Sequence, residues 1–195
     1  MWNIPLPPAV IEDTVARALA EDVGPGDLSL AAVPAEREVA ATIVAREAGV
    51  MCGRPFVDEV FSQLGGARLD WTVAEGDGLE PGQELVHLTG RAGVLLTGER
   101  TALNLLQTLS GTATATAAMV RAVAGTGVRI LDTRKTLPGL RTPQKYAVRV
   151  GGGHNHRHGL FDGVLLKENH LAWAGGLAEA VAAVRDTAPH TARLQ

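Results

Sequence analysis

The sequence is short of the residues on which several classes of protein depend. It has one cysteine among 195 residues, so no disulfide can form within the chain. Aromatic residues make up 4% of the chain, so its core has to be built mainly from aliphatic side chains. No apolar stretch approaches the ~20 residues that cross a membrane, and the first residues lack a secretory signal. We therefore expect a cytoplasmic protein that does not associate with membranes.

Lysine is absent from the chain before Lys135. This absence bears on VAEGDGLEPGQELVHL, residues 73–88, which resembles the hairpin of lipoyl- and biotin-carrier domains. Carrier domains attach their cofactor to a lysine at the hairpin tip, so the shape is possible here but the carrier chemistry is not. The glycine-rich EDVGPGDLS, residues 21–29, is not a P-loop, because it follows a predicted helix and lacks the Lys-Ser/Thr ending.

Positive charge is concentrated in residues 129–170, which we call the basic segment. It holds eight Lys or Arg against three acids, a local charge of +5, while the rest of the chain carries −8. A positive patch on an acidic protein favours a compact anionic ligand. Nucleic acid is not expected as a partner, since the patch is short, has one aromatic pair and lies beside surface that repels a long polyanion. The alternative is an ordinary solvated basic face.

The periodicity of the chain changes along its length. The first ~95 residues read as a small α+β domain, and after Gly125 short apolar strands alternate with helices. Such β/α units form a parallel sheet or barrel with the ligand at the carboxyl ends of the strands. Helices are predicted at 10–21, 54–65, 97–125 (interrupted at Gly111), 142–150 and 176–186, and strands within 38–53 and at 67–73, 83–90, 128–133, 161–167 and 192–195.

Two polar clusters follow the predicted strands 128–133 and 161–167. Arg134 and Lys135 stand directly after the first, and Lys167 ends the second. A guanidinium fork and an ammonium both suit a carboxylate or phosphate. A lysine at the end of a buried strand is costly unless an anion meets it. An exposed loop is the alternative for the first cluster alone.

Three alternating histidines, His154, His156 and His158, lie in HNHRH after three glycines. On a strand they would share a face and could bind zinc. Arg157 lies among them and no cysteine is near, so basic neighbours would oppose a bound dication. Imidazole and guanidinium donors facing a carboxylate are the favoured interpretation, and a plain surface loop stays open. We predict no protein-bound metal site.

Several motifs taken in order resemble one family. EDVGPGDLS, GERTALNLLQTLSGTATAT, DTRKTLPGLR, KYAVRVGGGHNHRHGL and LLKENH are similar to those of quinolinate phosphoribosyltransferase, with the densest similarity over 99–170. The resemblance implies transfer of a phosphoribosyl group from phosphoribosyl pyrophosphate to quinolinate, with loss of pyrophosphate and carbon dioxide. The product is nicotinate mononucleotide for NAD biosynthesis. It further implies Mg²⁺ bound with the pyrophosphate, and a homodimer with shared sites.

The resemblance also implies a fold and a set of site residues. The fold is α/β, with an N-terminal α/β sandwich over 1–111 and, over 112–195, the first part of an open TIM-like α/β barrel that is incomplete here. Quinolinate would be bound by Arg134, His156 and Arg157, with Thr133 in the same loop. Lys135 and Lys167 would bind substrate and act catalytically near the reacting groups. Arg100 would enter the partner subunit's site. His154 and His158 would flank the loop, and His170 would support local structure.

The sequence ends where the third predicted strand of the second part begins, so we expect it to be part of a longer enzyme and inactive alone. Two alternatives stay open. One is a related phosphoribosyltransferase-like protein with another acceptor. The other is a non-catalytic fragment that binds dicarboxylates or a full-length partner.

Overall fold

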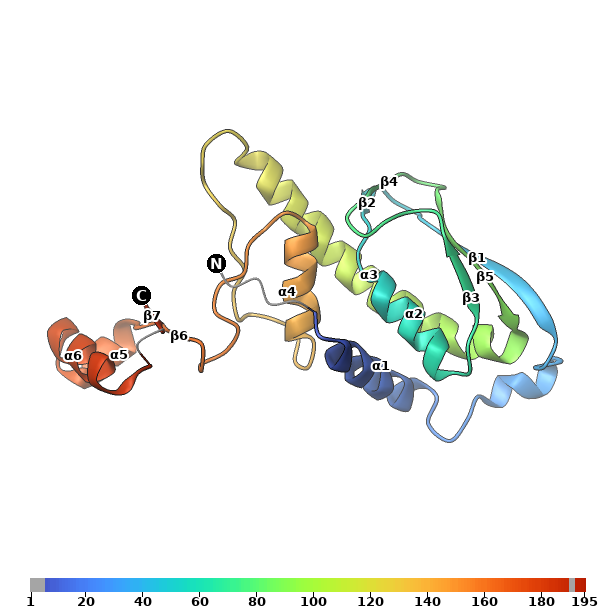
Figure 1. Cartoon of the computed structure of the whole chain (residues 1–195), viewed down its shortest axis with the longest axis horizontal. Coiled ribbons are helices and arrows are strands. Elements are labelled where there is room, and N and C mark those ends of the chain that lie inside the picture. The colour runs from blue at the N-terminus through green and yellow to red at the C-terminus, as the bar shows by residue number, and fades with distance from the viewer. Residues whose placement is uncertain (1–5, 190–191) are drawn as a thin grey trace.

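A computed structural model describes residues 6–189 and 192–195 (Figure 1). The order of elements is α1 (Pro8–Asp22), the 3₁₀ helix η1 (Leu28–Ala32), β1 (Glu38–Val44), β2 (Gly49–Val50), α2 (Arg54–Gln63), β3 (Arg68–Trp71), β4 (Gly78–Leu79), β5 (Glu84–Arg91), α3 (Ala92–Ala122), α4 (Arg141–Val150), β6 (Gly163–Val164), α5 (Glu168–Ala174), α6 (Leu177–Thr187) and β7 (Arg193–Leu194). The predicted helices 10–21, 54–65, 142–150 and 176–186 are confirmed as α1, α2, α4 and α6.

The N-terminal half is a mixed α/β unit. Its antiparallel sheet has the strand order β1-β5-β3, and α2 and α3 lie on one side of it (Figure 1). Helix α2 buries Phe56, Val57, Val60 and Phe61, whose spacing places them on one face of the helix. These side chains form the centre of the apolar core, together with the buried faces of β5 and α3.

Helix α3 differs from its prediction. It begins earlier than expected, at Ala92, and runs for 31 residues without a break, so the interruption predicted at Gly111 is wrong. A glycine inside a helix costs only about 1 kcal/mol relative to alanine. The burial of Leu105, Leu106, Leu109 and Ala113 along the same helix outweighs that cost. Because α3 crosses residues 111 and 112, the domain boundary placed there stays a prediction.

The C-terminal part contains only short strand pairings. β6 and β7 pair in parallel over two residues each, and Leu131 forms an isolated parallel bridge with His154. The parallel β/α character is therefore seen, but no barrel is formed by the described residues. The predicted strand 128–133 is reduced to that bridge, and helix α5 was not predicted. No helix within residues 6–189 or 192–195 combines the length and apolar character that crossing a membrane requires.

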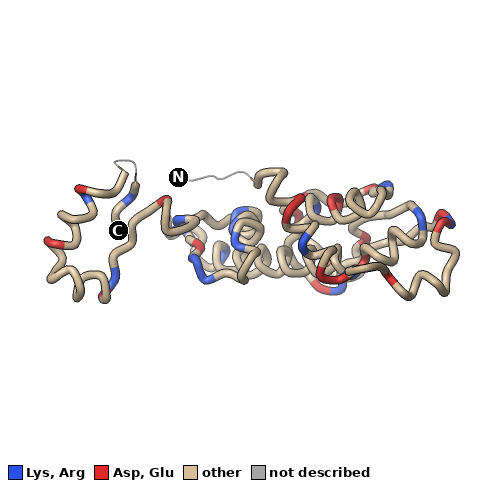
Figure 2. The backbone as a smooth tube through the Cα atoms, turned by 90° about the horizontal axis from the view of Figure 1, so that it is seen from below, with Lys and Arg blue, Asp and Glu red and all other residues tan. Residues whose placement is uncertain are grey.

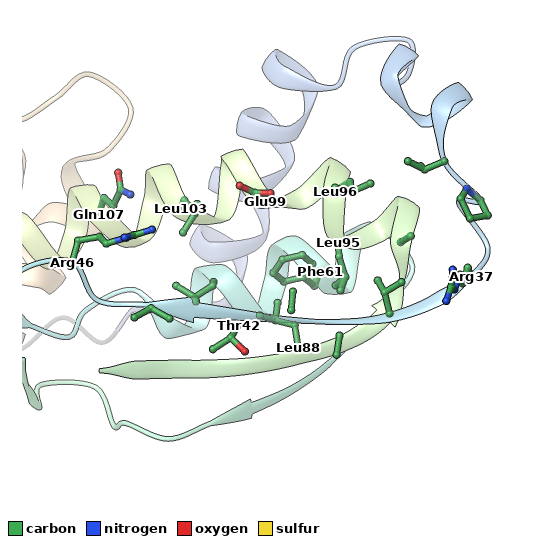
Figure 3. A pocket seen from close by; sticks show the side chains of 18 residues that line it. Arg37, Thr42, Arg46, Phe61, Leu88, Leu95, Leu96, Glu99, Leu103 and Gln107 are labelled. Carbon is green, nitrogen blue, oxygen red and sulfur yellow. The ribbon is translucent and has the colours of Figure 1, made fainter. Parts of the chain in front are cut away.

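A cavity of about 690 Å³ lies between β1 and α3 in the N-terminal half (Figure 3). Its apolar walls include Phe61, Leu88 and Leu95, and Arg37 and Arg46 lie towards its two ends. The predicted site residues, all within the described ranges, do not line this cavity. Most of the predicted site residues lie instead in the basic segment. The Lys and Arg positions of this segment gather around α4 and the adjoining loops (Figure 2).

Candidate functional site

The turn at residues 133–136 presents the first pair of predicted cations. Thr133 Oγ1 accepts a hydrogen bond of 3.0 Å from the Lys135 backbone N–H, which fixes the start of the turn. The Lys135 side chain is exposed, and Arg134 is half-buried. Within the described part of the chain, Arg134 Nε is buried and has no hydrogen-bond partner. A buried guanidinium N–H without an acceptor is costly unless a ligand supplies one.

The glycines before the histidines let the chain pass close to α3. A Cβ added to Gly151 would lie 2.4 Å from the Ala113 carbonyl oxygen, and one added to Gly153 would lie 2.8 Å from Thr116 Cγ2. Gly152 has φ +85°, a conformation that other residues rarely adopt. The three glycines therefore bring the histidine segment back beside the 128–132 segment.

The three alternating histidines do not converge on one point. His154 bonds through its backbone, donating from N–H to the Ile130 carbonyl at 2.9 Å. The His158 ring lies 3.1 Å from Thr142 Oγ1. The His156 ring lies 2.7 Å from Gln195 Oε1. In the described ranges, no group of three or more His, Cys, Asp or Glu side chains is placed to hold a metal ion.

The contacts of His156 define which of its ring nitrogens donates. Its Nδ1 accepts the Arg157 backbone N–H at 2.7 Å, so the proton of the neutral ring is on Nε2. Nε2 then donates to the amide oxygen of Gln195. Arg157 Nη1 donates to the Gly163 carbonyl at 2.9 Å, which orients its guanidinium.

A buried ion pair lies beneath these residues. The side chains of Lys145 on α4 and Asp132 are only 5% and 6% exposed, and Lys145 Nζ contacts Asp132 Oδ1. Lys145 Nζ also donates to the His156 carbonyl at 3.1 Å. Asp132 accepts from the His156 N–H at 2.8 Å and from Asn155 Nδ2 at 2.6 Å. The charge of Lys145 is thus neutralised internally and does not add to the positive surface.

The second acid of the basic segment is also occupied. Asp162 accepts hydrogen bonds from the backbone N–H groups of His158 at 2.7 Å and Gly159 at 2.8 Å. Burial by itself would raise the pKa of Asp162, but these backbone donors outweigh it and hold the pKa below its usual value. Burial, and then the charge of Lys145, lower the pKa of His158, so its ring is neutral at pH 7.

The carboxylate of Glu75 connects the basic segment to the N-terminal half. Glu75 accepts from the backbone N–H groups of Gly53 and Arg54 at the start of α2, at 2.7 and 3.1 Å. It also accepts from the Tyr146 hydroxyl on α4 at 2.9 Å. Burial first, and the Glu75 charge second, raise the pKa values of Tyr146 and Cys52, so both stay protonated. Two adjacent residues of helix α4 therefore hold it in place: Tyr146 contacts Glu75, which caps the start of α2, and Lys145 contacts Asp132.

His156 and Arg157 line a cavity of about 470 Å³. The basic side chains in its wall are those of Arg129, His156, Arg157 and Arg193, and the one acid is Asp162. Arg134, Lys135 and Lys167 do not line this cavity. The structure therefore brings two of the seven predicted binding residues, His156 and Arg157, together in one cavity wall and leaves the other five outside it.

The remaining predicted residues lie further away. Lys167 is exposed and precedes α5, and its backbone N–H donates to His170 Nδ1 at 3.0 Å. That contact confirms the structural role expected for His170. Arg100 is exposed on α3 and does not line the cavity that holds His156 and Arg157.

Asp132, Lys145 and Asn155 are residues that the sequence analysis missed. Thirteen residues separate Asp132 from Lys145 and ten separate Lys145 from Asn155, so no helix or strand periodicity relates them. The one available signal was the position of Asp132 at the end of a predicted strand.

Comparison with known proteins assigns the chain to a family. Residues 27–110 match the N-terminal domain of quinolinate phosphoribosyl transferase, and residues 112–195 match its C-terminal domain. The nicotinate-nucleotide pyrophosphorylase (carboxylating) of Mycobacterium leprae is 50% identical over 183 residues, which are 91% of this chain and 64% of that protein. A probable nicotinate-nucleotide pyrophosphorylase (carboxylating) of Bacillus subtilis is 43% identical over 176 residues, 90% of this chain and 61% of that protein.

Solved structures give the same result. NadC from Streptococcus pyogenes superposes with a TM-score of 0.92 at 40% identity, over 98% of this chain and 69% of that chain. The chain belongs to the quinolinate phosphoribosyltransferase family. It spans somewhat less than two thirds of the length of the two curated relatives, 64% and 61%.

Proposed function

We propose that the chain supplies the quinolinate-binding part of an enzyme that makes nicotinate mononucleotide from quinolinate and phosphoribosyl pyrophosphate. The observation that carries the proposal is the cavity of about 470 Å³, which has four basic side chains and a single, internally bonded acid in its wall. Quinolinate has two adjacent carboxylates, and a confined set of fixed cationic donors suits such a ligand. Membership of the family supports the choice of acceptor.

In this proposal, the residues predicted from the sequence have defined tasks, and Arg129 and Arg193 add positive charge to the cavity wall. Arg157 and the Nε2–H of His156 bind one carboxylate, which replaces Gln195 Oε1 as the partner of Nε2. Arg134 lies on a turn outside the cavity wall, and its buried Nε, which has no acceptor among the described residues, binds the other carboxylate. Lys135, which follows the 128–132 segment, and Lys167, which precedes α5, orient the ring nitrogen towards the ribose carbon and favour the departing pyrophosphate. Thr133 fixes the turn that carries Arg134 and Lys135.

After ribosylation, the bond between the ring and the carboxylate next to the ring nitrogen breaks, and CO2 leaves. The electron pair stays on the ring carbon, where the adjacent cationic nitrogen stabilises it, and that carbon then takes up a proton from solvent. No covalent enzyme intermediate is required by this chemistry. The exposed position of Arg100 on α3 is compatible with its action in a second copy of the chain, so we propose a homodimer with shared sites.

The described residues do not form a site for the Mg²⁺ that accompanies phosphoribosyl pyrophosphate. They contain no suitable group of three or more acidic, His or Cys side chains, and Asp132 and Asp162 are both occupied by internal hydrogen bonds. For the 195-residue chain by itself we propose quinolinate binding without turnover. Formation of nicotinate mononucleotide by the purified chain with both substrates and Mg²⁺ would contradict that proposal.

The test is a thermal melt of the chain with quinolinate and with nicotinate, which has one carboxylate. Quinolinate at 100 times its Kd should stabilise the folded chain by about 2.7 kcal/mol, a shift of several degrees. Nicotinate at the same concentration should shift the melt much less. Arg157→Ala should abolish the quinolinate shift, and Arg68→Ala, on the exposed strand β3, should leave it intact. If quinolinate does not change the melting temperature of the wild-type chain, quinolinate is ruled out as the acceptor.

A further inference from the structure

The buried pair of Lys145 and Asp132 has no assigned part in the chemistry. Lys145 is the one lysine of the chain that is buried, with 4% of its surface exposed. Its Nζ is occupied by Asp132 Oδ1 and the His156 carbonyl oxygen. It therefore cannot serve as another cation for the substrate, although it belongs to the basic segment.

The contacts of the pair show what it does instead. The backbone of His156 is bonded on both sides, through its N–H to Asp132 and through its carbonyl to Lys145. Asn155 adds a further connection, because its Nδ2 donates to Asp132 Oδ2 and to the Lys145 carbonyl at 2.9 Å. The His156 ring extends to the other side, where it reaches Gln195 and lines the cavity.

The residue that carries this carboxylate is also connected to the first turn. Asp132 directly precedes Thr133, Arg134 and Lys135, and its own backbone N–H donates to the His154 carbonyl at 3.0 Å. The two turns that carry the predicted substrate cations are therefore joined through one buried carboxylate. A shift of that carboxylate would move both turns together.

We propose that Asp132 and Lys145 are positioning residues for quinolinate binding, which set the separation between the Arg134 turn and the His156–Arg157 segment. The inference rests on the proposed function. Residues that hold metal ligands in place typically change metal affinity by about 10- to 100-fold when replaced. We expect a comparable effect on quinolinate affinity, because small displacements of the binding groups weaken every contact.

A role in positioning and a role in stability alone predict different behaviour of a double variant. Asp132→Asn and Lys145→Met each leave one buried charge without its partner, so each should destabilise the fold. The double variant, D132N/K145M, has no buried charge, and its stability should recover towards that of the wild type. Its His156 carbonyl still lacks a donor and its Asn155 still lacks a carboxylate acceptor, so its quinolinate affinity should stay low.

The experiment is calorimetric titration of quinolinate into the wild-type chain, both single variants and the double variant, with urea unfolding of each. We expect the double variant to unfold near the wild-type midpoint and to bind quinolinate about 10- to 100-fold more weakly. Val57→Ala, a substitution in the fully buried part of α2, is the control that should lower stability and leave affinity unchanged. The double variant decides the question even where the single variants do not fold.

The outcomes separate the two proposals. Wild-type affinity in a stably folded double variant would overturn the positioning role and leave the proposed function standing. A wild-type chain that does not bind quinolinate would overturn the proposed function, and the positioning role would be lost with it. Weak binding by the double variant, next to tight binding by Val57→Ala, would support both.

Discussion

The N-terminal half and the basic segment differ in what holds them together. The buried apolar cluster extends from Val15 to Ala113, and Ala147 is its one fully buried member from the basic segment. The basic segment relies instead on glycines that allow close approach and on buried polar pairs such as Lys145 with Asp132. Apolar burial has no direction, whereas hydrogen bonds and ion pairs fix geometry. The N-terminal half therefore provides a rigid support, and the basic segment provides hydrogen-bond donors with fixed orientations.

The largest expected effect on the free energy of unfolding comes from replacing a buried phenylalanine of the N-terminal half. The comparison is an exposed phenylalanine of the basic segment. Phe56 is fully buried, so Phe56→Ala should lower the free energy of unfolding by about 3–5 kcal/mol. Phe161 is 79% exposed, so Phe161→Ala should change it by no more than about 0.5 kcal/mol. Urea unfolding followed by circular dichroism measures both. Equal losses would mean that the basic segment has an apolar core of its own.

Two glycines give the next comparison. Gly151→Ala would place a methyl group 2.4 Å from the Ala113 carbonyl oxygen, and such overpacking should cost about 1–3 kcal/mol. Gly111 lies inside α3 with no atom near its added Cβ, so Gly111→Ala should stabilise the chain by about 1 kcal/mol. Opposite shifts in melting temperature are expected. Destabilisation by Gly111→Ala would show that this position needs a glycine for a reason other than packing within the chain.

Loss of the hydrogen bond that Tyr146 donates to Glu75, which connects the two regions, should lower the free energy of unfolding moderately. Tyr146→Phe removes the hydroxyl that donates to Glu75 while keeping the ring, and should cost about 1–3 kcal/mol because the acceptor is a carboxylate. Glu75→Gln tests the same contact from the other side. A double-mutant cycle on unfolding free energies should give a clear coupling between the two positions. If the effects of the two substitutions on unfolding free energy simply add, the hydrogen bond between Tyr146 and Glu75 does not contribute to stability.

The smallest expected effect is a pH dependence of the chain's stability that comes from His158 in the basic segment. The pKa of His158 is lowered from 6.5 in the folded chain, so the unfolded chain binds a proton more readily. Stability should therefore be fully present above pH 6.5 and fall as the pH drops through that value. His158→Gln should flatten this part of the curve, as measured by urea midpoints between pH 5 and 8. An unchanged slope would assign the effect to other groups.

Local patterns predicted the elements that depend on nearest neighbours along the chain. The amphipathic pattern of residues 54–65 predicted helix α2, and β-branched content with partial alternation predicted the strand β1. The break expected at Gly111 was wrong, because packing along α3 outweighs the preference of one residue. The strand expected at 128–133 was found only as a bridge to His154, because pairing depends on a partner strand that periodicity does not identify.

The sequence by itself determined the family, through motifs in a fixed order, and the clustering of cations in residues 129–170. Only the tertiary structure decided which of those cations face a cavity. It joined Lys145 to Asp132 inside the protein and left Arg157 and His156 in a cavity wall. The reason is physical: a side chain's charge is a property of its residue type, whereas its partner and exposure depend on residues that folding brings together.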